Sequence, residues 1–164
     1  MVSPILAKFL NKNDLIINEV VLNKAQREGQ VIYGAKAYNY QSPTHLRKTT
    51  YDYDVLTKKP KRSAKEVVKE LNRRLGEEVK LSKGSHKGTY RVKVSGQVVA
   101  DYTQLRKKPK TKKIWGIEAR DLKSIKRNVQ RLIKNPKSEY RREKDLDTFN
   151  KIQEIERIDK AFDF

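Results

Sequence analysis

The sequence predicts an α+β protein in which a small mixed β-sheet is flanked by helices and followed by a C-terminal helical pair. Its 164 residues are enough for one domain with one core. Charged residues make up 36% of the chain, yet apolar residues recur with regular spacing along most of it. The expected elements run in the order helix, strand, helix, several strands and two helices, which is typical of a mixed sheet. We expect a single domain (1–164) with an N-terminal helical segment (1–30), a sheet core (31–118) and C-terminal helices (119–164).

The first half of the chain is expected to alternate helices with extended segments. In chain order we expect a helix over 14–29, an apolar segment that turns into a helix of small residues over 31–41, a basic loop over 42–50, a strand over 50–56, a basic connector over 58–62 and a helix over 63–75. Gly34 marks the turn from extended segment to helix, Ser63 is a typical helix cap, and Gly76 ends the helix.

The second half should contain most of the sheet and the helical pair. In chain order we expect extended segments over 78–84, 88–94 and 97–105, a basic connector over 106–113, a short strand over 114–119, a helix from 121 to 134 and a last helix over 138–161. Ser95-Gly96 is a hairpin signal, and Asn135-Pro136 closes the first of the two C-terminal helices. The segment SKGSHKG indicates a flexible hairpin in which His86 is at most an accessory contact.

The charge balance points to a polyanionic partner. Lys and Arg number 39 against 20 Asp and Glu, for a net charge of +19 and a pI near 10. Such a field attracts nucleic acid, with RNA favoured over DNA, although a lysine-rich proteome would give the same composition. The absence of cysteine excludes disulfides and thiolate sites, and two histidines disfavour a histidine metal cluster. The apolar stretch in the N-terminal segment MVSPILAKFL is too short and too interrupted for a signal peptide. We therefore expect an intracellular protein (cytoplasmic or nuclear, or packaged in a virus particle) without a membrane partner.

The pair Asp52 and Asp54 is the first candidate for chemistry. The two residues lie one apart in a strand-forming run, so their side chains share a face about 7 Å apart. A third carboxylate, Asp101, stands inside an apolar strand, where an unpaired charge is costly. It could lie at a sheet edge, pair with Arg or Lys, or share a metal with the first two. A Thr-rich hairpin with exposed aspartates is the alternative for the pair itself.

Taken in order, these residues resemble the nucleotidyltransferase superfamily that includes DNA polymerase beta and the kanamycin nucleotidyltransferase. There an apolar strand runs into a Gly-Gly or Gly-Ser turn opening a helix, a strand with two carboxylates one residue apart follows, and a later strand brings a third. Gly34, then Asp52 and Asp54, then Asp101 match this order. The segments IWGIEARDLKSIKRNV and EYRREKDLDTF resemble the toxin-like and viral minimal members, whose last helix bears a Lys-Asp-Leu signature. The resemblance spans residues 31–152.

The resemblance implies a role for each matching residue. Asp52 and Asp54 would hold a Mg²⁺ (or Mn²⁺) ion bound to the nucleoside triphosphate (NTP) substrate. Asp101 would join them at a second ion near the attacking hydroxyl. Backbone amides around Gly34 and Ala35 would face the triphosphate, and Lys144 would contact a phosphate.

Three departures from the family pattern affect the phosphate contacts. The turn is Gly34-Ala35, so the serine hydroxyl of a Gly-Ser turn is missing. Lys48, with Arg47 beside it, stands where the family often has arginine, and lysine cannot bind phosphate as a bidentate fork. Asp147 follows directly after Leu146, with Thr148 in the usual slot of the second acid. Loss of activity is therefore an alternative.

Two basic runs, each containing Lys-Lys-Pro, follow the carboxylate strands. They are either solvated loops (the first also passes for a nuclear import signal) or a phosphate-binding rim around the carboxylates. The candidate nucleic-acid contacts are Lys58, Lys59, Lys61, Arg62, Arg106, Lys107, Lys108, Lys110, Lys112 and Lys113.

The sequence thus favours a Mg²⁺-dependent nucleotidyltransferase that adds a nucleotide from an NTP to the hydroxyl of an RNA or tRNA end. One alternative is an inactive protein of the same fold that binds nucleic acid or belongs to a virus particle. Another is transfer of a nucleotide to a protein, which the positive charge disfavours unless the target is acidic.

Overall fold

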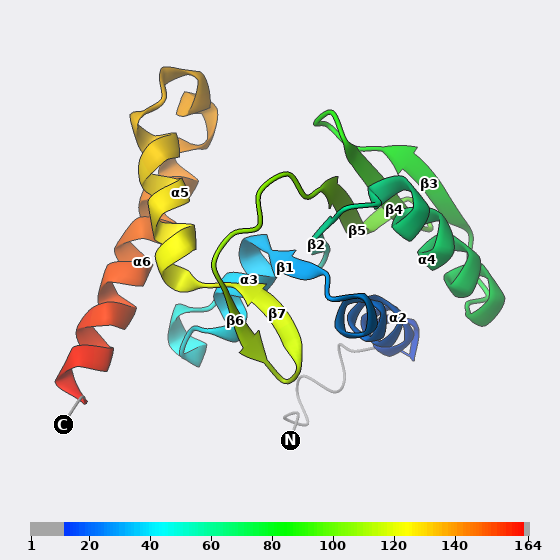
Figure 1. Cartoon of the computed structure of the whole chain (residues 1–164), viewed down its shortest axis with the longest axis horizontal. Coiled ribbons are helices and arrows are strands. Elements are labelled where there is room, and N and C mark those ends of the chain that lie inside the picture. The colour runs from blue at the N-terminus through cyan, green and yellow to red at the C-terminus, as the bar shows by residue number, and fades with distance from the viewer. Residues whose placement is uncertain (1–11, 163–164) are drawn as a thin grey trace.

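The computed structural model describes residues 12–162, and Figure 1 shows their arrangement. The helices are α2 (Lys12–Glu28), α3 (Gly34–Tyr40), α4 (Pro60–Arg74), α5 (Leu122–Lys134) and α6 (Arg142–Ala161), with short 3-10 helices at Thr44–Leu46 and Pro136–Arg141. The strands are β1 (Val31–Tyr33), β2 (Tyr53–Thr57), β3 (Val79–Lys83), β4 (Thr89–Val94), β5 (Gln97–Gln104), β6 (Thr111–Ile114) and β7 (Ile117–Arg120). None of the helices in 12–162 is apolar over enough of its length to cross a membrane.

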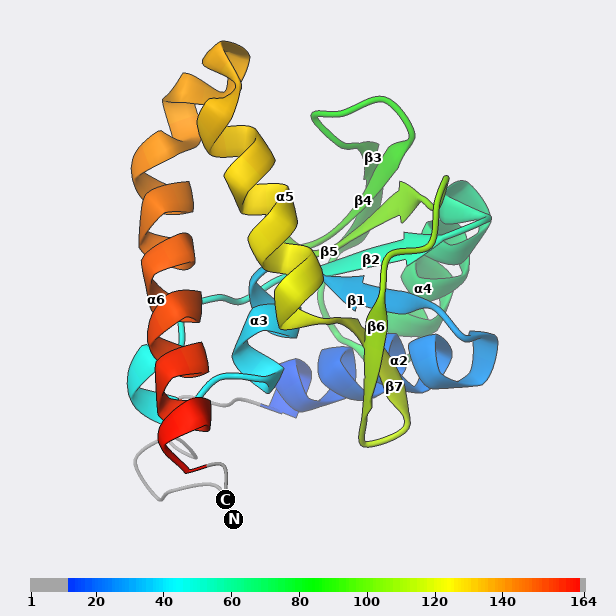
Figure 2. The same cartoon turned by 60° about the vertical axis from the view of Figure 1, so that its left-hand side comes forward.

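Within the described chain the strands form one mixed sheet in the order β3-β4-β5-β2-β1-β7-β6. β2 lies between β1, to which it is antiparallel, and β5, to which it is parallel. The segment that links β5 to β6 therefore has to pass β2 and β1, and Figures 1 and 2 show it crossing the sheet. Together with the two C-terminal helices, this sheet confirms the predicted α+β class.

Helices α2 and α4 cover one face of the sheet and build the main core. Val21 of α2 and Leu71 of α4 are fully buried among strand residues such as Val55 and Val92. Each buried side chain of this size contributes about 1.5–3 kcal/mol relative to exposure. Burial alternates along β2, with Tyr53 and Val55 inside this core, so the side chains between them point to the opposite face.

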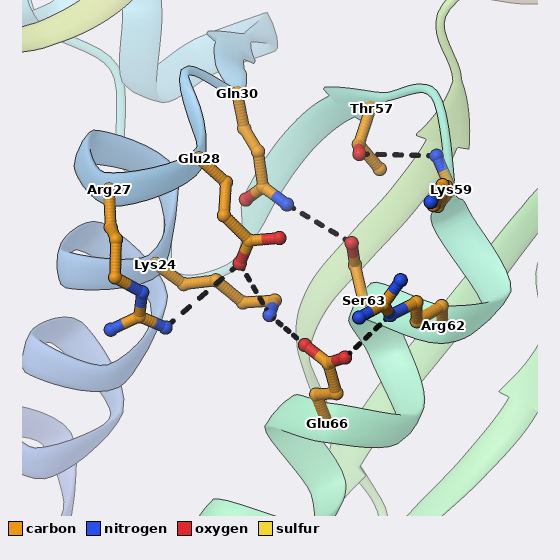
Figure 3. Close-up of polar contacts among 9 residues, drawn as sticks. All are labelled: Lys24, Arg27, Glu28, Gln30, Thr57, Lys59, Arg62, Ser63 and Glu66. Carbon is orange, nitrogen blue, oxygen red and sulfur yellow. Dashed lines mark hydrogen bonds and ion pairs between the residues drawn. The ribbon is translucent and has the colours of Figure 1, made fainter.

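A polar network ties α2, β1 and α4 together at the edge of this core, as Figure 3 shows. The buried Lys24 forms ion pairs with Glu28 (2.6 Å) and with Glu66 of α4. Arg62 donates to the other oxygen of Glu66 at 2.8 Å, and Gln30 donates to the Ser63 hydroxyl at 3.1 Å. Lys24, Glu28, Arg62 and Glu66 therefore each have a charged partner within hydrogen-bonding distance.

The C-terminal helices form a second, smaller layer. Figure 2 shows α5 and α6 side by side, away from α2 and α4. Their link to the rest of the fold passes through α3, where Tyr38 packs against Ile152 and Ile155 of α6. Asp121 caps α5, since its side chain accepts a hydrogen bond from the Ser124 amide at 2.7 Å. These contacts hold the pair beside the face of the sheet that α2 and α4 leave open.

The structure corrects three predictions about the basic connectors and the segments next to them. The segment over 114–119, expected to be one strand, is part of a hairpin whose turn is Trp115-Gly116, both with positive φ (51° and 78°). β6 begins at Thr111, so Lys112 and Lys113 lie in a strand and not in a connector. Helix α4 begins at Pro60, whose fixed φ suits a first helical position, and not at Ser63.

Two further boundaries differ from the expectation. The last helix begins at Arg142, because a 3-10 turn, capped by the Asn135 side chain, occupies the preceding residues. β2 begins at Tyr53, so Asp52 lies just before the strand and not within it. The hairpin at Ser95-Gly96 and the turn into a helix at Gly34 are confirmed. The expectation that the first residues form no signal peptide falls on residues 1–11, outside the described part.

Candidate active site

A cavity of about 890 Å³ lies between the open face of the sheet and the α5–α6 pair. Strands β1, β2, β4 and β5 supply one wall through residues such as Tyr33, Asp54 and Asp101. Helices α5 and α6 supply the facing wall, which includes Asn128 and Lys144. The cavity therefore joins residues from distant parts of the sequence at one site.

The three candidate aspartates meet in this cavity. Asp54 lies directly opposite Asp101 in the parallel pairing of β2 with β5. Asp52 lies just before β2 begins, two residues ahead of Asp54, and both side chains line the cavity. One carboxylate oxygen of each lies within 4.8 Å of the others. Of the sequence alternatives for Asp101, the sheet edge is wrong, because β5 is an interior strand, and the pairing with an arginine is confirmed. The shared metal stays a prediction.

Burial, together with the nearby Asp52 and Asp101 carboxylates, raises the pKa of Asp54 to about 7, although Lys144 and Arg91 act in the opposite direction. Arg91 is the partner of Asp101, donating from Nε at 2.8 Å and from Nη2 at 3.0 Å. One guanidinium does not balance three carboxylates. Grouped carboxylate oxygens are the ligands that Mg²⁺ and Mn²⁺ prefer, so the donor set fits a divalent cation.

Gly34 makes this geometry possible. Its φ is +66°, a left-handed conformation that favours glycine. A Cβ atom at this position would lie 2.2 Å from Oδ2 of Asp54, which is far inside van der Waals contact. Gly34 and Ala35 both line the cavity. The start of α3 can therefore approach the aspartates only because residue 34 has no side chain.

Cationic side chains gather at the α6 end of the cavity. Lys48 and Lys144 both line it, and Lys48 Nζ donates to the Thr148 hydroxyl. Burial, with a contribution from Lys144, lowers the pKa of Lys48 to about 8. Arg141 also lines the cavity and is held by the buried Asp145, with Nε 2.9 Å from Oδ2. This end suits the phosphates of an anionic ligand.

Arg47 is placed differently from its predicted role. Its Nε donates to the carbonyl oxygen of Ser42 at 3.1 Å, and the side chain is exposed. Among the described residues, Arg47 is not one of those that line the cavity. Of the two adjacent basic residues, Lys48 is the one that faces the site.

The two Lys-Lys-Pro runs lie at one edge of the sheet because β2 and β5 are parallel. The Leu105 amide donates to the Thr57 carbonyl at 2.8 Å, and the Gln104 side chain donates to the Lys58 carbonyl at 3.1 Å. None of the ten predicted nucleic-acid residues, all within the described range, lines the carboxylate cavity. Lys59, Lys61 and Arg62 line a separate cavity of about 600 Å³. Lys108 pairs with Glu118 at 2.8 Å.

Several cavity residues were not among the predicted site residues. Arg91, Tyr33 and Thr103 come from the sheet, and Arg120 and Asn128 come from the end of β7 and from α5. Thr103 had a signal in the sequence, since it lies two residues beyond Asp101 in the same strand and so shares its face. The others depend on strand register and helix placement, for which the sequence held no comparable signal.

Comparison with known proteins supports the fold. No family model matches the sequence, and no curated protein matches it. Among solved structures, the chain is similar to the Megavirus polyadenylate synthase, with 22% identity, a TM-score of 0.76 and coverage of 86% of this chain. The chain spans 31% of the length of that synthase. The chain therefore has a nucleotidyltransferase-like α+β fold.

Proposed function

We propose that this protein is a metal-dependent nucleotidyltransferase that adds a nucleotide from an NTP to a hydroxyl of RNA. The observation that carries the proposal is the convergence of Asp52, Asp54 and Asp101 in a cavity with a cationic end. The likeness to a viral polyadenylate synthase supports RNA as the acceptor. The net charge of +19 also favours a nucleic acid.

Asp52, Asp54 and Asp101 would hold Mg²⁺ or Mn²⁺. The bound cation would neutralise charge at the phosphates and lower the pKa of an attacking hydroxyl. Lys48, Lys144 and Arg141 would bind the triphosphate by charge, at the end of the cavity where they gather. Arg91 would orient Asp101 through its two hydrogen bonds.

The second candidate is a protein of the same fold that binds nucleic acid without turning over a nucleotide. The pairing of Arg91 with Asp101 favours it, because a guanidinium already neutralises one of the three carboxylates. The missing serine hydroxyl in the turn at Gly34-Ala35 also favours it. This candidate predicts salt-dependent binding that ignores Mg²⁺ and tolerates Asp52→Asn.

The test is a titration of Mg²⁺ and Mn²⁺ with each of the four labelled NTPs and with RNA and DNA acceptors. The proteins compared are wild type, Asp52→Asn and Asp54→Asn, with Asp159→Asn as a control for an exposed aspartate on α6. We expect transfer by wild type and by the control, and a loss of at least about 10³-fold in the two cavity variants. Equal transfer by wild type and both cavity variants would refute the proposal that the cavity carboxylates catalyse nucleotidyl transfer. No transfer by any protein, with unchanged nucleic-acid binding, would establish the second candidate.

A further inference from the structure

Three neutral hydroxyl groups form a row inside the carboxylate cavity. The hydroxyls of Tyr33 and Thr103 share a hydrogen bond of 3.0 Å, and those of Thr103 and Thr89 share one of 2.8 Å. The three residues come from β1, β5 and β4, and all three line the cavity. We call this set the hydroxyl row. It reaches across β2, which lies between β1 and β5 in the sheet.

The hydroxyl row lies on the opposite side of the carboxylates from Lys48 and Lys144, while Arg120, which also lines the cavity, is close enough to act on Tyr33. Thr103 follows Asp101 by two residues, so it stands about 7 Å farther along β5 on the same face. Thr103 pairs with Leu56 of β2, whereas Asp101 pairs with Asp54. Thr103 therefore lies farther from Asp52 than Asp101 does. Lys48 precedes Asp52 and contacts α6. A ligand whose phosphates occupy the cationic end would therefore place uncharged groups toward the row.

The chemistry of the row suits a sugar hydroxyl. Each hydroxyl has one hydrogen to donate and lone pairs that accept. The two hydrogen bonds within the row use two of the three hydrogens, which leaves one donor and several acceptor positions. A tyrosine phenol keeps its hydrogen at neutral pH, so Tyr33 can donate as well as accept. A group that both donates and accepts, as a ribose 2′-hydroxyl does, matches this set.

We propose that the hydroxyl row binds the 2′-hydroxyl of a ribose and makes the site selective for ribonucleotides over deoxyribonucleotides. The inference rests on the proposed function for its chemical setting. The ribose belongs either to the 3′ end of the acceptor or to the incoming NTP, and both present the same hydroxyl. A purely structural row, which only ties the three strands together, would show no preference between the sugars.

The test uses variants matched at one position. Thr103→Val removes the hydroxyl and keeps the shape, whereas Thr103→Ser keeps the hydroxyl. Tyr33→Phe removes the other end of the same hydrogen bond. Tyr90→Phe is the control, because Tyr90 lies on β4 between Thr89 and Arg91 and so points to the opposite face. Each protein is assayed with RNA acceptors that differ only in the 3′-terminal sugar, and with ATP against dATP.

Two readouts are collected: the ratio of kcat/KM for the ribo and deoxy forms, and the ratio of their affinities measured without turnover by fluorescence anisotropy. We expect wild type, Thr103→Ser and Tyr90→Phe to prefer ribose. Thr103→Val and Tyr33→Phe should lose about three- to tenfold of that preference, the loss expected for one hydrogen bond. The substrate in which the preference falls, acceptor or NTP, identifies the ribose.

The outcomes separate this inference from the proposed function. If no protein transfers a nucleotide, the proposed function fails, but a binding preference lost in Thr103→Val and kept in Thr103→Ser still supports the ribose site. If transfer occurs and the preference is equal in all variants, the proposed function stands and the ribose site is refuted. Equal affinity of wild type for both sugars, with equal turnover, also refutes it.

Discussion

The pKa of a carboxylate is shifted in opposite directions on the two faces of the sheet. On the α2–α4 face, hydrogen bonds from Lys24 and Arg62 lower the pKa of Glu66 to about 2. On the cavity face, burial and two neighbouring carboxylates raise the pKa of Asp54 to about 7. The two side chains carry the same chemical group, so the difference comes from how deeply each is buried and from its partners.

The comparison separates charge that stabilises the fold from charge that serves binding. Glu66 gains cationic partners when the chain folds, and its ionised form is favoured. Asp54 gains two anionic neighbours, so its ionised form costs folding free energy. A site of this kind is stabilised by a cation that only the folded protein binds. The predictions below test this difference, from the largest expected effect to the smallest.

Among these further changes, Gly34→Ala should have the largest effect, because the new Cβ would displace the Asp54 carboxylate. We expect about a 10²-fold loss of nucleotidyl transfer, since small misplacements of reacting groups cost about this much. The matched control is Gly29→Ala, where φ is also positive (+63°) but nothing lies within 4 Å of the added atom. The control should lose only about 1 kcal/mol of stability to backbone strain and keep its activity. Equal activity losses in the two variants, measured beside thermal unfolding, would contradict the role given to Gly34.

Metal affinity should depend on pH through Asp54. Its pKa is about 7 in the folded protein and 3.8 in a free side chain. The folded state therefore holds a proton that the unfolded chain has released, and stability without metal falls as pH rises from about 4 to about 7. A cation competes with that proton, so Mn²⁺ affinity should drop by up to about tenfold per pH unit below pH 7.

Calorimetric titration with Mn²⁺ at several pH values measures this dependence directly. At pH 8 and a Mn²⁺ concentration of about 100 times the Kd, the metal should raise the free energy of unfolding of wild type by about 2.7 kcal/mol. Asp54→Asn serves as the reference, because it has no proton to displace at this position. Identical pH profiles for the two proteins would show that Asp54 does not bind the metal.

Glu66→Gln should have the smallest effect, and only on stability. Glu66 is a partner of the buried Lys24, which would keep Glu28 as its other carboxylate. We expect a loss of about 1 kcal/mol in denaturant unfolding, with nucleotidyl transfer unchanged. Glu70→Gln is the control, since its partner Arg73 is exposed and the pair should contribute nothing measurable. A loss of transfer in Glu66→Gln would mean that the two faces are coupled.

The sequence predicted the order of the elements from local patterns, whereas the grouping of Asp101 with Asp52 and Asp54 was implied by the family resemblance. Asp52 and Asp54 share a face by strand alternation, and Gly34 marks a turn that only glycine accepts. The partner of Asp101 could not be predicted in the same way. The β4–β5 hairpin begins with Val94 opposite Gln97, and continuing that register would place Tyr90 opposite Asp101. A register shift near Val92 places Arg91 there instead.

The basic runs show a second limit of the sequence. Their spacing after the two carboxylate strands suggested a rim around the site, and parallel pairing does bring them to one edge. That edge is the one at which β2 and β5 end, whereas Asp52 lies before the start of β2. Charge composition predicts that a nucleic acid binds, but it carries no information about which edge of the β-sheet that nucleic acid contacts.

The parallel pairing of β2 with β5 has a consequence for how the protein acquires its site. Helix α4 and strands β3 and β4 lie between these neighbours in the chain, so a long loop must close before Asp54 meets Asp101. Loop closure of this kind slows folding, because its entropy is lost before the contacts form. During synthesis, Asp52 and Asp54 leave the ribosome well before Asp101 and the two helices that wall the cavity. We therefore expect a nascent chain to carry no assembled carboxylate cluster until the residues through α6 are available, so that the proposed site forms only when this fold is complete.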